Sequence, residues 1–175
     1  MDYSSDSSST MAIFDTRQCV AFTGHRSYKG ERYDVLLATI RELYNEGYTT
    51  FLSGMALGFD MAAAEAVISL RQELPSLRLI CVIPFEGQQR GFPQQERERF
   101  ERIVASANEA VTLLPKYQTN AFLLRNDFLV ENSSLLVAYF TGESGGTAYT
   151  VKKATKKALR LINLHLNPQQ KLDFI

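Results

Sequence analysis

Short apolar runs alternate along this chain with segments whose apolar residues recur every three or four positions, as on a helix. The runs cover residues 19–23, 49–52, 79–83, 111–114, 135–140 and 161–164. Because apolar residues fill the runs instead of every second position, the strands they predict are buried on both faces. The alternation predicts an α/β fold, a three-layer sandwich in which helices cover both faces of a mainly parallel sheet.

The length of 175 residues suits a single domain. We predict that domain over residues 17–166, between a flexible N-terminal tail over 1–16 and a C-terminal tail over 167–175. Five of the first nine residues are serine, which favours a frayed terminus. The same segment has neither the basic patch nor the apolar stretch of a secretory signal, so we expect a cytoplasmic protein.

The charge balance and the residue types narrow the classes of partner. The 19 basic and 19 acidic residues give a net charge of zero, whereas general nucleic-acid-binding proteins carry a basic excess. No run approaches the roughly 18 apolar residues of a membrane helix. Cys19 and Cys81 lie inside apolar runs and are expected to be buried thiols. The two histidines lie far apart in the sequence, so we expect no metal site.

Polar and glycine-rich segments follow four of the predicted strands. In an open parallel sheet, ligands bind beyond the carboxyl ends of the strands. We therefore expect Thr23, Ser53, Pro84 and Tyr139 to lie at one edge of the sheet. The segments that follow are TGHR (23–26), SGMALGFD (53–60), PFEGQ (84–88) and GESGGT (142–147). The need for a turn explains one such loop, but the presence of four such loops at one edge of the sheet favours a binding site.

Two of these segments have features of phosphate-binding loops. Ser53-Gly54 and Gly58 stand between a strand and a helix, where backbone N–H groups and the helix dipole suit a phosphate. The alternative is a tight turn with Asp60 as helix N-cap. Gly145-Gly146-Thr147 repeats the arrangement, with Thr147 able to cap the helix or to bond a phosphate. The sequence contains neither a Walker A motif nor a G-x-G-x-x-G fingerprint.

Further candidates are side chains near the same edge. Arg26 offers a planar donor group for a phosphate, and His25 can stack or donate, although both could be ordinary surface residues. Arg125 is either a second phosphate clamp or a surface side chain. The predicted ligand-binding residues are Gly24, His25, Arg26, Ser53, Gly54, Met55, Ala56, Gly58, Pro84, Phe85, Gln88, Arg125, Asn126, Gly145, Gly146 and Thr147.

With these motifs in view, the sequence resembles the SLOG superfamily, and within it the YpsA/YoqJ-like branch. The resemblance rests on TGHR, SGMALGFDMAAAEAV, IPFEGQ, Arg125-Asn126 and SGGT, and it spans about residues 19–163. It implies a Rossmann-like fold and a nucleotide-type ligand, with no required cofactor. The superfamily includes the Lonely-guy phosphoribohydrolases and the DNA-processing protein DprA.

The sequence departs from the Lonely-guy pattern at the position of its catalytic acid. There a P-G-G-x-G-T motif precedes glutamates, whereas here AYTVKKA follows Thr147. An oxocarbenium-like transition state needs a nearby carboxylate. Asp60 and Glu86 are the candidate catalytic residues, with Glu65 a further acid near the edge. We expect the start of a helix to keep Asp60 ionised.

Three functions remain open from the sequence. The first is binding of a nucleotide or an ADP-ribose- or NAD-like ligand as a sensor or regulatory domain, with Phe85 and Met55 contacting base or ribose. The second is hydrolysis of nucleoside monophosphates to release the base. The third is a DprA-like role on DNA through the basic run at residues 152–160, although such a run is more often a solvated helix face. A homodimer is left open, with Phe92, Phe122 and Phe128 as candidates for an apolar patch.

Overall fold

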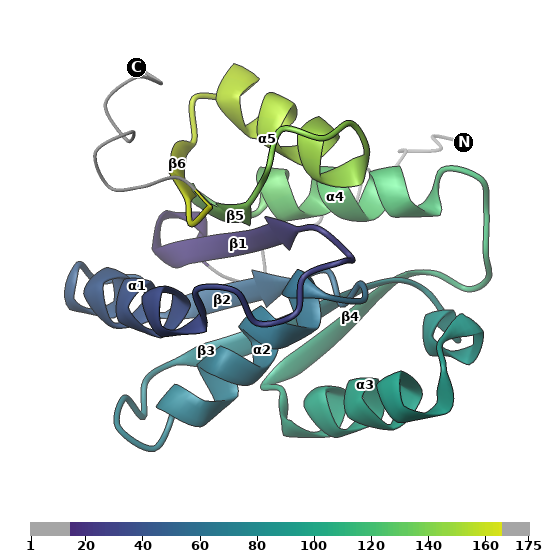
Figure 1. The fold of residues 1–175 in the computed structure, drawn as a ribbon, viewed down its shortest axis with the longest axis horizontal. Helices are drawn as coiled ribbons and strands as arrows, with labels where there is room; N and C mark the ends of the chain where they lie inside the picture. Colours follow the sequence, from purple (N-terminus) through teal and green to yellow (C-terminus); the bar gives the residue numbers. More distant parts are fainter. Residues whose placement is uncertain (1–14, 166–175) are drawn as a thin grey trace, which may run out of the picture.

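The computed structural model describes residues 15–165, so most of both predicted tails (1–16 and 167–175) lies outside the described residues. One six-stranded sheet with the order β4-β3-β2-β1-β5-β6 forms the centre, and every strand pair in it is parallel (Figure 1). The strands are β1 (Cys19–Gly24), β2 (Thr50–Ser53), β3 (Arg78–Phe85), β4 (Glu109–Leu114), β5 (Leu135–Tyr139) and β6 (Arg160–Asn163). The α/β sandwich predicted from the apolar runs is confirmed, and so is the Rossmann-like fold that the family resemblance implies.

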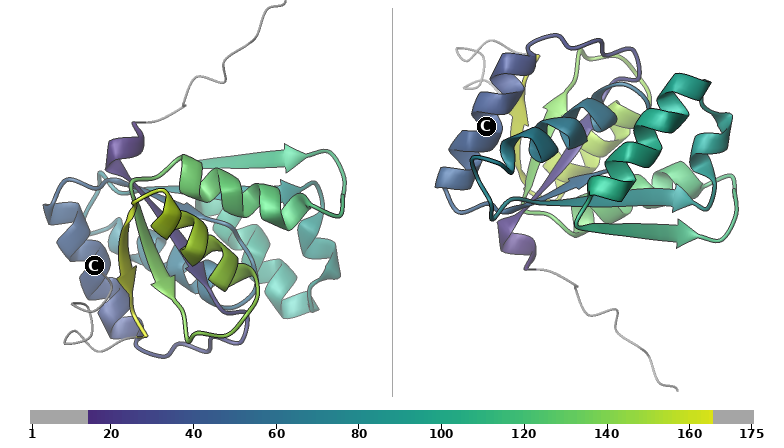
Figure 2. Two further views of the ribbon diagram at one scale, coloured as in Figure 1. Left: turned by 90° about the horizontal axis from the view of Figure 1, so that it is seen from above. Right: turned by 90° about the horizontal axis from the view of Figure 1, so that it is seen from below.

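Helices cover both faces of this sheet. Figures 1 and 2 show α1, α2 and α3 on one face and α4 and α5 on the other. Two short 3-10 helices, η1 (Thr16–Gln18) and η2 (Gln88–Gly91), precede β1 and α3. The α-helices are α1 (Tyr33–Asn45), α2 (Phe59–Leu70), α3 (Gln94–Ser106), α4 (Ala121–Glu131) and α5 (Gly146–Lys156).

The two helical layers explain why the strands are apolar throughout. In β1, Val20 and Phe22 belong to the core under α1–α3, whereas Cys19 and Ala21 belong to the core under α4 and α5. All four side chains are fully buried. Burial raises the pKa of Cys19 to about 11, which keeps its thiol protonated. The edge strand β4 differs, because its residues are only half-buried or exposed.

Parallel pairing brings the carboxyl ends of the strands to one edge. Thr23 pairs with Ala138 in β5, and Ser53 pairs with Cys81 in β3. The expectation that Thr23, Ser53, Pro84 and Tyr139 share one edge is therefore confirmed. The chain runs from β1 to β4 in one direction and then returns to place β5 on the other side of β1. Such a switch point leaves a crevice between diverging connections, where α/β proteins bind ligands.

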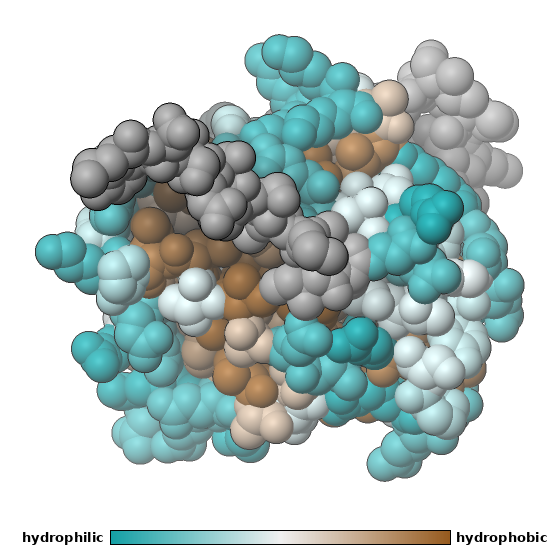
Figure 3. All heavy atoms as spheres, turned by 180° about the vertical axis from the view of Figure 1, so that it is seen from behind, coloured by the Kyte–Doolittle hydropathy of each residue, from teal (hydrophilic) through white to brown (hydrophobic). Residues whose placement is uncertain are grey.

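The surface offers a few exposed apolar side chains. Figure 3 shows apolar areas on the face opposite to that of Figure 1, surrounded by hydrophilic residues. Of the three phenylalanines expected to form a patch, only Phe122 is exposed, at 42%. Phe92 and Phe128 are half-buried against the cores on opposite faces of the sheet, so the three do not form one patch. No helix within residues 15–165 has both the length and the apolar character needed to cross a bilayer.

The close approach of β1 and α2 yields a testable prediction. A Cβ at Gly24 would lie 2.4 Å from the ring of Phe59. Phe59 is fully buried, and the ring of Tyr28 packs edge-on against it with the ring centres 5.2 Å apart. The Phe59 ring therefore has little room to move. Gly24→Ala should therefore lower the free energy of unfolding by about 1–3 kcal/mol in urea denaturation.

Gly91→Ala is the matched control, because no atom lies within 4 Å of the Cβ it would add. We expect its effect to stay within about 0.5 kcal/mol. Equal stability of the two variants would contradict the packing described for Gly24.

Candidate functional site

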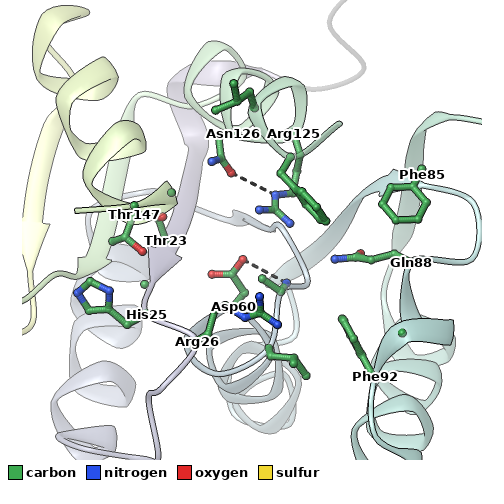
Figure 4. A pocket seen from close by; sticks show the side chains of 18 of the residues that line it. Thr23, His25, Arg26, Asp60, Phe85, Gln88, Phe92, Arg125, Asn126 and Thr147 are labelled. Carbon is green, nitrogen blue, oxygen red and sulfur yellow. Dashed lines mark hydrogen bonds between the residues drawn. The ribbon is translucent and has the colours of Figure 1, made fainter. Parts of the chain in front are cut away.

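A cavity of about 550 Å³ opens at the carboxyl edge of the sheet (Figure 4). Its walls come from the ends of β1 and β3, the loop before α2, and the first turns of α4 and α5. This volume suits a small-molecule ligand. The predicted residues that line it are Gly24, His25, Arg26, Ala56, Asp60, Phe85, Gln88, Arg125, Asn126, Gly145, Gly146 and Thr147.

Several polar groups of the loop after β2 are paired with one another. The Ser53 hydroxyl donates to the Asp60 carbonyl at 2.8 Å and accepts from the Met55 N–H at 3.3 Å. The Ala56 N–H donates to Asp60 Oδ2 at 3.3 Å. Two backbone N–H groups of this loop, those of Met55 and Ala56, are therefore already paired within it, and the predicted phosphate contact at Gly54–Gly58 stays a prediction. Met55 is fully buried in the core and does not line the cavity, so its position does not support the predicted contact with base or ribose.

Gly58, Pro84 and Glu86 also lie outside the cavity lining. Gly58 is the N-cap of α2, with a φ of 83°, and a Cβ there would lie 2.4 Å from the Arg26 carbonyl oxygen. Pro84 is buried within β3. Glu86 is exposed, in the turn that follows β3. The prediction of Glu86 as a catalytic carboxylate is therefore not supported by its position.

Asp60 lies deeper than its sequence position indicates. It is in the first turn of α2 but is not the N-cap, and only 5% of its surface is exposed. Burial raises its pKa to about 6, although the charge of Arg125 and the hydrogen bond from Ala56 act in the opposite direction. The expectation that a helix terminus sets the ionisation of Asp60 is corrected, because desolvation dominates.

Arg125 reaches the same place from the other helical layer. The side chain is 8% exposed, and its Nη1 donates to the Gly54 carbonyl at 3.1 Å. Its Nε donates to Asn126 Oδ1 at 3.2 Å, and its guanidinium lies 5.4 Å from the centre of the Phe122 ring. Figure 4 shows the guanidinium facing Asp60 across the cavity. Arg125 is thus a buried cavity residue and not a surface side chain.

The first turn of α5 forms another wall. Gly145 is the N-cap, with a φ of 138° and no side-chain capping bond, so Thr147 is not the cap of this helix. Thr147 is 8% exposed and lines the cavity with Gly145 and Gly146. The first N–H groups of a helix have no acceptor within the helix and carry a partial positive charge. This wall can therefore accept an anion.

His25 and Arg26 differ in their availability to a ligand. His25 Nε2 accepts the Thr141 backbone N–H at 3.0 Å and lies 2.9 Å from the Thr141 hydroxyl. These contacts tie the end of β1 to the loop after β5 and occupy that ring nitrogen. Arg26 is exposed and lines the cavity mouth. Within the described part of the chain, no cluster of three metal-ligating side chains occurs.

Phe85, predicted from the sequence, forms an aromatic wall with Tyr117 and Phe122, which sequence reasoning missed as ligand residues. The ring centre of Phe85 lies 5.4 Å from that of Tyr117 and 5.9 Å from that of Phe122. Tyr117 is 58% exposed and Phe122 42%. Tyr117 belongs to the loop after β4, and Phe122 to the first turn of α4. The rule that ligand residues follow strand ends would have found them had it been applied to the fourth strand. Phe92, also missed as a ligand residue, lies beside the same cavity.

Residues 32–166 match the model of the YspA SLOG family. This chain belongs to that family. UPF0398 proteins are similar to it: one from Bacillus thuringiensis (strain Al Hakam) is 32% identical over 111 residues, which cover 62% of this chain and 60% of that protein. Another from Bacillus velezensis is 31% identical over 121 residues, covering 67% of this chain and 66% of that one.

Solved structures share the fold of this YspA SLOG protein. DNA processing protein A from Streptococcus pneumoniae superposes with a TM-score of 0.59 at 21% identity, covering 81% of this chain and 48% of that one. DNA processing protein A from Helicobacter pylori superposes with a TM-score of 0.62 at 22% identity, and the match covers 84% of this chain and 65% of that one. At these identities the likeness concerns the fold alone.

The buried carboxyl of this YspA SLOG protein yields a prediction about pH. The pKa of Asp60, about 6 in the folded chain, lies above its ordinary value of 3.8, so the folded state holds the proton more tightly. Protonated Asp60 therefore makes its whole contribution to the free energy of unfolding below pH 4, and this contribution is lost as the pH rises through 6. Relative to Asp60→Asn, the wild type should lose about 1–3 kcal/mol of unfolding free energy between pH 4 and pH 7. A stability difference between the two proteins that does not change with pH would contradict the burial described for Asp60.

Proposed function

We propose that the cavity binds a nucleotide or a nucleotide-derived ligand of the ADP-ribose or NAD type, and that the protein acts as a sensor or regulatory domain. The observation that carries the proposal is the order of apolar and polar groups along the cavity. Aromatic side chains form one end, the N-terminus of α5 forms another, and buried polar groups lie between them. A nucleotide has the same sequence of parts: a flat base, a hydroxylated sugar and an anionic phosphate.

The aromatic wall supports binding of the base. Phe85, Tyr117 and Phe122 offer ring surface at the cavity mouth, and Tyr117 and Phe122 are exposed. Base–aromatic stacking contributes about 1–3 kcal/mol per base and tolerates any base. Covering these exposed rings also removes apolar surface from water.

The wall from α5 supports binding of the phosphate. Gly145, Gly146 and Thr147 line the cavity at a helix N-terminus. Asn126 lies beside them, because its Nδ2 would be 3.7 Å from a Cβ at Gly146. Arg26 at the mouth adds a long cationic side chain, and a charge-assisted hydrogen bond from it is worth about 1.5–3 kcal/mol.

The centre of the cavity suits a ribose. One carboxylate oxygen of Asp60 is bonded to the Ala56 N–H, and Figure 4 shows the other directed into the cavity. A carboxylate oxygen accepts hydrogen bonds from sugar hydroxyls, and the opposing Arg125 guanidinium balances its charge. The sugar would thus lie between the two helical layers.

A role on DNA has less support. The Helicobacter pylori DNA processing protein A binds single-stranded DNA, but the likeness of that protein to this chain extends to the fold alone. The basic run at residues 152–160 is partly neutralised, because Lys153 pairs with Asp127 at 2.5 Å and Lys157 with Glu131 at 3.6 Å. The net charge of the chain is zero. We therefore favour the small ligand.

A second candidate function rests on Asp60. A buried carboxyl whose pKa is raised to about 6 is typical of groups that exchange protons or stabilise charge in an active site. Hydrolysis of a nucleoside monophosphate would use Asp60 to orient a water molecule or to stabilise the positive charge that develops on the ribose.

Loss of the Arg26 side chain tests the binding proposal. Arg26→Ala should weaken AMP by about tenfold to a hundredfold in calorimetry, because one charge-assisted contact to phosphate is lost. Adenosine, which lacks the phosphate, should bind both proteins equally.

Lys29→Ala is the matched control, since it removes the same charge from a neighbouring residue outside this cavity. Its AMP affinity should equal that of the wild type. If Arg26→Ala binds AMP as tightly as this control, Arg26 is not a phosphate clamp.

Release of free base tests the second function. If the protein is a hydrolase, the wild type releases base from nucleoside monophosphates, and Asp60→Asn slows release by at least about a hundredfold, the scale of acid–base catalysis. Chromatography of the products measures both rates. No release by the wild type leaves the binding function alone, and an equally active Asn variant removes Asp60 from the mechanism.

A further inference from the structure

Gln88 has an unusual position for a polar side chain. It begins η2, directly beyond the end of β3, and only 6% of its surface is exposed. Figure 4 shows it between Phe85 and Phe92, with its amide directed into the cavity toward Asp60 and Arg125. The cavity wall at this end is therefore aromatic on both sides and polar in the middle.

The amide oxygen of Gln88 lacks a hydrogen-bond partner. Among residues 15–165, this Oε1 and the hydroxyl of Tyr28 are the buried side-chain oxygens or nitrogens without one. A buried acceptor left unpaired costs about 1–3 kcal/mol. An apolar side chain of similar volume, such as methionine, would avoid that cost, so the amide is explained if it turns its oxygen toward a ligand in the cavity.

The flanking rings restrict what that ligand can be. Gln88 lies between Phe85 and Phe92 (Figure 4). A flat group whose face packs against these rings turns its edge, and not its face, toward the Gln88 amide. The oxygen and nitrogen ends of an amide have nearly the same shape, so a half-turn lets Gln88 place either one foremost. A ligand edge that carries a donor beside an acceptor can form hydrogen bonds with both ends of the amide.

We propose that Gln88 reads the hydrogen-bonding edge of a nucleobase, and that the ligand of this site is a nucleotide with an intact base and not merely a phosphorylated sugar. The inference rests on the proposed function, because it assumes that the cavity holds a nucleotide. Every common base has such an edge, so the native amide binds more than one base. The residue at position 88 then sets which base is preferred.

Gln88→Met separates reading of the base from support of the fold. Methionine keeps the volume and removes the unpaired oxygen, so the variant without nucleotide should be at least as stable as the wild type in thermal unfolding. Its affinity for the tightest binder among AMP, GMP, CMP and UMP should fall about tenfold to a hundredfold in calorimetry, the scale of a bidentate amide–base pair. Ribose 5-phosphate should bind both proteins equally.

Gln88→Glu gives a result that a structural role would not produce. A carboxylate only accepts, and guanine offers two adjacent donors on one edge, so the ratio of GMP to AMP affinity should rise at least about tenfold. An unchanged ratio together with full nucleotide affinity in Gln88→Met would overturn the assignment of Gln88. Failure of the wild type to bind any nucleotide would instead overturn the proposed function, and this inference with it.

Discussion

A buried guanidinium and a buried carboxyl, brought from opposite sides of the sheet, form the centre on which the site depends. Arg125 comes from α4 and Asp60 from α2, and both are at least nine-tenths buried. They meet at Gly54, where a Cβ would lie 2.8 Å from Arg125 Cδ and 3.0 Å from Asp60 Oδ2. Burying two charges is costly unless each finds partners. The Gly54 carbonyl and the Ala56 N–H supply those partners from one loop.

This arrangement fixes the relative position of the two helical layers at the cavity. Because Arg125 is held by Gly54 and by Asn126, the N-terminal half of α4 is anchored over the end of β2. Phe122, one turn earlier on the same helix, is then placed beside Phe85 from β3. The aromatic wall and the polar centre of the cavity thus share one anchor, and a change at Gly54 would disturb both.

The fold could be predicted from the sequence because it follows from a pattern in which many residues take part. Six apolar runs predict six strands, and their uniform burial predicts two helical layers. The site is predicted in outline for a similar reason, since parallel strands must end together. His25, Gln88 and Thr147 line the cavity because of where their strands end.

The remaining details depend on side-chain direction and on competition for hydrogen bonds. Met55 turns into the core, and Ser53 and Asp60 accept hydrogen bonds from two backbone N–H groups of the same loop, which no spacing reveals. Glu86 is exposed and outside the cavity lining, whereas Gln88, the first residue of η2, is buried and lines the cavity.

The most direct test of a nucleotide site is an amide NMR titration of the isotopically labelled protein with AMP. We expect fast or intermediate exchange shifts at two separate walls: the amides of Gly146 and Thr147 on α5, and those of Phe85, Gln88 and Phe122 at the aromatic end. Phosphate alone should shift only the α5 amides. Shifts confined to residues outside the cavity, or none at millimolar AMP, would contradict a nucleotide site at this edge of the sheet.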